Sequence, residues 1–273
     1  MTPPPLSETC CGRTSLWLWP GHALYNGPAL DLDMHSGAVA CLAVGLDDPF
    51  TIDIPHRPTR TARSALIAPR TRHRLVAQGR MVFCYFDPSS PRRGTCADQM
   101  TAGDAVLGLN HADERRLLHF RPTQNWLDLA APPGPIRTDP RIDQAIATLR
   151  AQVHRMVSAE ELARGCGLSV SRFLHLFAAH TGTSFRRYRL WTRMLRAAQL
   201  VAENEDLTTA ATEAGFATPS HFSDAFHRMF GLQPSRLLAT GATIVVIKPA
   251  PAPATPAATC TKELKIRSGR PLL

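Results

Sequence analysis

The sequence lacks the features that mark membrane-spanning, secreted and zinc-ribbon proteins. No apolar run is long enough to cross a bilayer, and the start, MTPPPLSETC, does not join a basic region to an apolar run as a secretion signal does. The seven cysteines are irregularly spaced and include no CxxC pair, which disfavours a zinc ribbon or a redox dithiol. We therefore expect a cytoplasmic protein with reduced, mostly buried thiols and no membrane partner.

What the sequence has in excess is positive charge. Its 273 residues carry a formal net charge of +9, and arginine far outnumbers lysine. The length allows two domains with ordinary cores. A basic excess suits a polyanion such as nucleic acid but does not establish one, because basic surfaces also favour solubility.

The C-terminal half contains a sequence pattern that occurs twice between Ser158 and Arg236. Equivalent positions are 48 residues apart up to the glycine of the turn and 49 apart after it: Ala163 and Ala211, Gly167 and Gly215, Phe177 and Phe226, Gly182 and Gly231, Phe185 and Pro234. Chance rarely repeats a spacing with one local insertion. The pattern therefore predicts two copies of one structural unit, the second with an extra residue in its turn.

Each copy predicts a helix, a tight turn and a second helix. Four residues are placed to cap these helices: Ser158, Ser169, Asp206 and Thr218. Aromatic residues at helical spacing form the expected buried stripes: Phe173 and Phe177, then Phe222 and Phe226. Small alanines at the helix crossing and a glycine turn are typical of a helix-turn-helix, whose second helix can enter the major groove of DNA.

A long helix is predicted between the copies, from Arg186 to Glu203. Its apolar face carries Tyr188, Trp191, Leu195, Ala198 and Ala202, and another face carries a stripe of arginines. Such a helix is roughly 27 Å long, close to the rise of about 34 Å of one DNA turn. It could set two recognition helices into successive major grooves.

These residues resemble the DNA-binding domain of the AraC/XylS family of bacterial transcription regulators. The second motif of that family stands here as Gly215-Phe216, Phe222, Phe226, Phe230-Gly231 and Pro234. The resemblance implies a regulator, more often an activator than a repressor, that binds double-stranded promoter DNA, contacts RNA polymerase and is not an enzyme.

Residues on the outer faces of the recognition helices are the candidate DNA contacts. In the first unit they are Ser169, Val170, Ser171, Arg172, Leu174 and His175, and in the second Thr218, Ser220, His221, Ser223 and Asp224. Leu174 offers only apolar contact, for example to a thymine methyl, and Asp224 could accept a hydrogen bond from cytosine N4. Phosphate contacts are predicted for Arg187, Arg193 and Arg228, although each could equally lie on a solvated helix face.

The N-terminal part predicts a β jelly roll, which makes the chain α+β overall. Apolar and polar residues alternate over residues 30–35 and 50–54. Further short runs cover 38–44, 64–68, 73–77 and 81–86, with Gly, Pro and Asp clusters between the runs. By its position this domain resembles the cupin-like sensory domain of the same family. Five residues are candidates for a small-molecule pocket, or simply fill the interior: Trp17, Trp19, Met34, His35 and His73. Two histidines do not make a closed metal site, so we expect no metal and no cofactor.

The predicted boundaries are 1–96 for the cupin-like domain and 97–131 for a helical segment, in which the resemblance implies homodimer formation. A proline-rich linker covers 132–138, the double helix-turn-helix domain 139–238, and a disordered Pro/Ala-rich tail 239–273.

Three alternatives remain at this stage. The first is a ligand-independent regulator with a purely structural roll. The second is a metal-dependent cupin enzyme fused to a DNA-binding domain. The third is a repair sensor switched by a reactive cysteine, for which Cys96 near Arg92 and Arg93 is the candidate.

Overall fold

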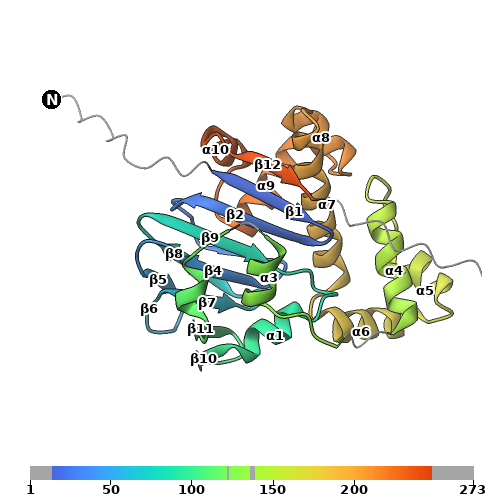
Figure 1. The fold of residues 1–273 in the computed structure, drawn as a ribbon. Coiled ribbons are helices and arrows are strands. Elements are labelled where there is room, and N and C mark those ends of the chain that lie inside the picture. Colours follow the sequence, from blue (N-terminus) through green and yellow to red (C-terminus); the bar gives the residue numbers. More distant parts are fainter. Residues whose placement is uncertain (1–13, 122, 136–138, 248–273) are drawn as a thin grey trace, which may run out of the picture.

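The computed structural model describes residues 14–121, 123–135 and 139–247. Its N-terminal part consists of two β-sheets packed face to face, and helices follow in the C-terminal part (Figure 1). The predicted α+β class, a cupin-like roll followed by a double helix-turn-helix, is confirmed. None of the helices in the described part of the chain has the length and hydropathy that a bilayer crossing requires.

The larger sheet has eight strands in the order β10-β11-β7-β4-β9-β2-β1-β12. Their bounds are Met100–Gly103 (β10), Leu107–His111 (β11), Ser64–Ile67 (β7), Cys41–Gly45 (β4), Arg80–Tyr85 (β9), His22–Pro28 (β2), Ser15–Trp19 (β1) and Thr243–Val246 (β12). The smaller sheet has the order β3-β8-β5-β6, formed by His35–Ser36, Arg72–Val76, Phe50–Asp53 and Arg60–Ala62. Neighbouring strands are antiparallel except β1 and β12, which are parallel.

Both faces of the larger sheet are covered, so its central strand β4 is buried throughout. In β4, Leu42 and Val44 belong to the core beneath helix α3 (Gln124–Ala130), whereas Ala43 belongs to the core between the two sheets. The period of two residues along a strand sends neighbours to opposite cores. This double cover explains why β4 reads as a continuous apolar run in the sequence.

The predicted strand over residues 30–35 is wrong for most of its length. Only His35 and Ser36 pair in a sheet, as β3. The backbone N–H of Asp33 instead donates to the carbonyl of Gly231 at 2.8 Å. The alternation of apolar and acidic residues therefore reflects packing of an extended segment against the C-terminal part. The sequence pattern alone does not distinguish this packing from strand pairing.

The helical prediction for residues 97–131 is only partly correct. After α1 (Arg92–Asp98), the chain forms the hairpin β10–β11, whose second strand extends the sheet by pairing Leu107 with Ile67. Among the described residues of the remainder, only α2 (Glu114–Leu117) and α3 are helical. The sheet thus continues beyond the predicted boundary at residue 96.

The C-terminal part contains seven helices within the described residues. They are α4 (Pro140–Ala151), α5 (Ala159–Gly165), α6 (Val170–Thr181), α7 (Phe185–Ala202), α8 (Leu207–Glu213), α9 (Pro219–Phe230) and α10 (Pro234–Ala239). The turn between α8 and α9 is one residue longer than the turn between α5 and α6, as the repeat predicts.

The strand β12 follows the last of these helices and corrects the prediction of a disordered tail from residue 239. It lies beside β1 at the edge of the N-terminal sheet (Figure 1), with Thr243 opposite Ser15 and Val246 opposite Leu18. The remaining predicted tail, 248–273, and linker residues 136–138 lie outside the described residues. Residues 132–134 lie against α1, where the Thr95 hydroxyl donates to the Pro132 carbonyl at 2.6 Å.

Candidate nucleic-acid interface

The first recognition helix, α6, presents its predicted DNA-facing side chains to solvent. It begins at the cap Ser169, whose hydroxyl accepts from the N–H of Arg172 at 3.3 Å. Phe173 and Phe177 are fully buried, whereas Ser171, Arg172, Leu174 and His175 are exposed and Val170 is half-buried. Leu174 is 39% exposed. Its position among polar neighbours suits apolar contact with a base edge.

The second recognition helix, α9, repeats this arrangement with different side chains. Thr218 caps it by accepting from the N–H of His221 at 3.0 Å, and Pro219 occupies the first turn. Thr218, Ser220, His221 and Asp224 are exposed, and Ser223 is half-buried. Nothing in the described part of the chain pairs with the Asp224 carboxylate, so it is free to accept from a base amino group.

Helix α7 joins the two units because its halves belong to different cores. Phe185 and Tyr188 pack with α4, α5 and α6, whereas Trp191, Met194, Ala197 and Leu200 pack with α8 and α9. The sequence predicts this helix to within one residue at each end. Of the predicted apolar face, Tyr188 and Trp191 are buried, whereas Leu195, Ala198 and Ala202 are only half-buried. Since α7 is a single unbroken helix, the two units have a defined separation along it.

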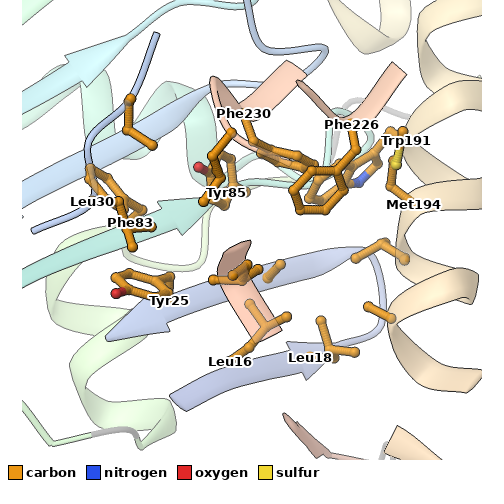
Figure 2. Close-up of a pocket in the computed structure, with 16 residues that line it drawn as sticks. Leu16, Leu18, Tyr25, Leu30, Phe83, Tyr85, Trp191, Met194, Phe226 and Phe230 are labelled. Atoms are coloured by element: carbon orange, nitrogen blue, oxygen red, sulfur yellow. The ribbon is translucent and has the colours of Figure 1, made fainter. Parts of the chain in front are cut away.

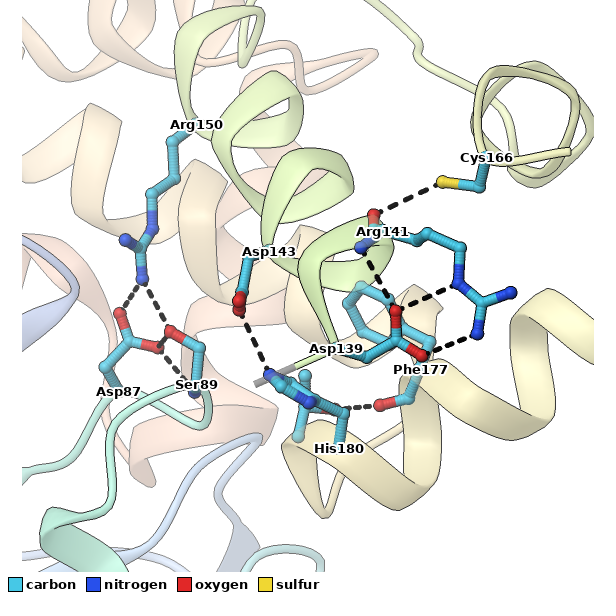
Figure 3. A network of polar contacts seen from close by, with 10 residues as sticks. Asp87, Ser89, Asp139, Arg141, Asp143, Arg150, Cys166, Phe177 and His180 are labelled. Atoms are coloured by element: carbon cyan, nitrogen blue, oxygen red, sulfur yellow. Dashed lines mark hydrogen bonds and ion pairs between the residues drawn. The ribbon is translucent and has the colours of Figure 1, made fainter. Parts of the chain in front are cut away.

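Helix α4 fixes the first unit and also reaches the N-terminal sheet (Figure 3). Asp143 pairs with His180 near the end of α6 at 3.2 Å, and the Cys166 thiol donates to the Arg141 carbonyl at 3.2 Å. At the other end of α4, Arg150 forms an ion pair with the buried carboxylate of Asp87 in the loop after β9. The network therefore connects the first helix-turn-helix to the roll through polar contacts.

The three arginines predicted to bind phosphate differ in their surroundings. Arg228 is exposed, and Arg187 is half-buried with its guanidinium 3.4 Å from the Gly37 carbonyl. Arg193 is only 7% exposed, and its guanidinium lies beneath the turn at Gly215 and donates to the Met156 sulfur at 3.2 Å. Burial lowers the pKa of Arg193. A buried side chain cannot reach a phosphate, so the prediction for Arg193 is wrong.

An apolar cavity lies between the roll and the second helix-turn-helix unit, not inside the roll (Figure 2). Strands β1, β2 and β9 form one wall, and α7, α9 and α10 form the other. None of the five predicted pocket residues lines it. Trp17 and Trp19 point to the opposite face of β1, toward α3, since they alternate with Leu16 and Leu18.

The residues that line the cavity from the C-terminal part were missed as pocket residues. They include Trp191, Met194, Phe226 and Phe230. The available signal was the apolar face of α7, on which Trp191, Leu195 and Ala198 recur at helical spacing.

His35 and His73 lie together at the edge of the smaller sheet, with ring centroids 4.3 Å apart. Each Nδ1 lies within hydrogen-bond distance of a backbone carbonyl, that of Asp33 for His35 and that of Thr71 for His73. Burial lowers the pKa of both imidazoles, to about 4 for His73. The described residues contain no group of three or more His, Cys, Asp or Glu side chains that could hold a metal ion.

Cys96 is not a reactive thiol, which removes the observation behind the cysteine-switched alternative. Its side chain is fully buried in α1, and burial raises its pKa to about 12. A thiolate is the nucleophilic form, and burial in apolar surroundings suppresses it.

Comparison with known proteins supports the helix-turn-helix assignment. Residues 162–240 match the family model described as "Helix-turn-helix domain". The chain is 33% identical over 105 residues to the HTH-type transcriptional activator RhaS of Escherichia fergusonii, which covers 38% of each chain. It is 27% identical over 220 residues to the HTH-type transcriptional regulator GlxA of Rhizobium meliloti, covering 74% of this chain and 63% of GlxA. The matches thus span less than two thirds of either relative.

The whole fold is similar to that of ToxT from Vibrio cholerae. An apo form of ToxT that carries one substitution gives a TM-score of 0.54 at 13% identity, covering 81% of this chain and 98% of ToxT. Wild-type ToxT with a bound unsaturated fatty acid gives a TM-score of 0.51 at 13% identity, covering 80% and 94%. At this identity the likeness concerns the fold alone.

Proposed function

We propose that this chain is a sequence-specific DNA-binding regulator of transcription of the AraC/XylS type, because residues 162–240 match a helix-turn-helix family model. The observation that carries this proposal is the pair of capped recognition helices, both of which expose their outer faces while their apolar stripes are packed inward. The 18 residues of α7 separate them by a helix of roughly 27 Å. Successive major grooves on one side of DNA are about 34 Å apart.

Each unit reads a different block of sequence in this proposal. Ser171, Leu174 and His175 contact the first block, and Ser220, Ser223 and Asp224 contact the second. Arg187 and Arg228 contact phosphates, which adds affinity without sequence preference. Asp224 favours a cytosine, and Leu174 favours a thymine methyl.

The proposed output is activation, in line with the name of the relative RhaS, a transcriptional activator. Contact with RNA polymerase is the proposed route to that output. A small molecule that binds between the roll and the helices would control it, in line with the fatty acid bound to ToxT. The segment 97–131 is the proposed dimer contact. Sedimentation velocity of the full chain tests the dimer, and transcription of a reporter in vitro tests the output.

Selection from random-sequence DNA with the full chain tests the central proposal. We expect a motif of two blocks with centres about one helical turn apart. A variant with Ser171→Ala and His175→Ala should lose preference in one block only, and a variant with Ser220→Ala and Asp224→Ala in the other. Each pair is the control for its counterpart, since both leave the buried stripes intact.

The charge contribution is tested separately by a salt series. Arg228→Ala should weaken binding to all sequences and reduce the slope of log affinity against log salt by about 1. Arg60→Ala, at an exposed arginine on β6 of the roll, is the control for a loss of one positive charge. Binding without a selected motif, or a motif that survives both double substitutions, would rule out the proposed reader.

A further inference from the structure

The apolar cavity of Figure 2 has an unusual composition for a regulatory site. The sixteen described residues that line it are leucine, alanine, methionine, phenylalanine, tyrosine or tryptophan. None of them carries a charge, and none is a serine, threonine, asparagine, glutamine or histidine. The space open to the centre of a water-sized molecule is about 70 Å³, so the cavity exceeds the volume that one water needs.

The few polar groups on the lining residues already have partners. The Tyr25 hydroxyl donates to the Pro28 carbonyl at 2.8 Å, and the Trp191 indole N–H donates to the Gly21 carbonyl at 3.0 Å. The Tyr85 hydroxyl is paired with the Cys41 thiol. An anionic ligand would therefore find neither a cation nor a free donor, and an unpaired carboxylate in such surroundings is strongly unfavourable.

Aromatic rings form much of the wall. Tyr85 lies 5.4 Å from Phe230 in an edge-to-face arrangement and 6.0 Å from Trp191, measured between ring centroids. Phe226 and Phe230 of α9 are 4.6 Å apart. Rings that already meet at tilted and perpendicular angles offer both faces and edges to a further ring.

We propose that this cavity binds a small, uncharged, single-ring aromatic molecule and rejects its carboxylate counterpart. The chemistry of the wall sets both preferences, because the apolar surface favours the ring and the absence of a free donor or cation penalises the charge. Ligand binding itself does not depend on the proposed function. An effect of the ligand on DNA binding does rest on the proposed function, because a ligand that touches Phe226 and Phe230 contacts α9, the helix proposed to read DNA. The fatty acid of ToxT is an acid, so the ligand class proposed here differs from it.

Toluene and benzoate are the matched probes, because they carry the same ring and differ in charge. Binding of each to the full chain is measured by saturation-transfer NMR and by titration calorimetry, without DNA. We expect toluene to bind and benzoate to bind at least about tenfold more weakly, a difference of about 1.4 kcal/mol. Ala198→Leu, which fills the cavity from α7, should abolish toluene binding. Ala147→Leu, on the exposed face of α4, is the control for the same substitution and should change nothing.

A second variant tests the charge argument by a gain of binding. Leu195 is half-buried and lines the cavity, so Leu195→Lys places an ammonium group at its rim. This variant should bind benzoate more tightly than the wild type does. Equal binding of both probes to the wild type, no binding of either, or toluene binding that survives Ala198→Leu would overturn the proposal. A chain that binds toluene but selects no DNA motif would refute the proposed function and leave this inference standing.

Discussion

The glycines that end the two recognition helices provide a matched test of how firmly the second unit is held against the roll. Gly182 after α6 and Gly231 after α9 both have left-handed backbones, with φ of 65° and 78°. Alanine in this conformation costs roughly 1–2 kcal/mol at either position. The backbone cost is therefore shared, and any difference between the two variants comes from their surroundings.

Those surroundings differ sharply. A Cβ at 182 would meet only the end of the flexible Arg93 side chain, at 3.0 Å. A Cβ at 231 would lie 2.7 Å from the backbone oxygen of Asp33 and 2.7 Å from Nδ1 of His35. The end of the Arg93 side chain can move away from a new Cβ, but the backbone of Asp33 cannot. Overpacking of this kind typically costs about 1–3 kcal/mol.

We therefore expect Gly231→Ala to lower the free energy of unfolding by about 1–3 kcal/mol more than Gly182→Ala does. Urea unfolding of both variants, followed by tryptophan fluorescence and by far-UV circular dichroism, measures the difference. The two probes must coincide for a single free energy to be defined. Equal losses in the two variants would show that α9 is not pressed against the Asp33 segment, and the described contact between the two parts would be refuted.

Three further predictions concern single elements. Ser158→Ala removes the cap that accepts from the N–H of Glu161 at 3.1 Å and should cost about 1 kcal/mol in urea unfolding, whereas Ala147→Leu on α4 should cost far less. Because burial holds the pKa of His73 near 4 in the folded protein, the unfolded chain binds more protons as the pH falls from about 6.5 to about 4. The free energy of unfolding should therefore decrease as the pH is lowered from about 6.5 to about 4. Unfolding curves taken across this window should show a smaller decrease for His73→Phe. Thr243→Pro removes the N–H that donates to the Thr14 carbonyl at 2.9 Å and should lower the thermal midpoint of the roll, an outcome absent if β12 contributes nothing.

The helix-turn-helix units could be predicted almost completely from the sequence because their determinants are local. Ser158, Ser169, Asp206 and Thr218 cap the helices that they were predicted to cap, each by accepting from a backbone N–H two or three residues ahead. A cap and an apolar stripe depend on residues within one or two turns. The exposed faces of α6 and α9 follow from the same stripes.

The cavity could not be predicted because it depends on which part of the chain covers each face of β1. Leu16 and Trp17 are both apolar, and only the placement of α3 and α9 decides that Leu16 faces the cavity. Arg193 illustrates the same limit, since its spacing fits the basic stripe but Met156 and Gly215 enclose its side chain. Tertiary contacts between distant segments carry this information, and local periodicity does not.

The pairing of β12 with β1 has a consequence for the order of folding during synthesis. Its partners are roughly 230 residues apart in the chain, among the most distant contacts that the fold contains. While the ribosome makes the helical part, β1 exposes an open edge of unpaired N–H and carbonyl groups, which is a template for association with other strands. The nascent roll is therefore open to such association until β12 emerges, which happens only after the helix-turn-helix units have been made.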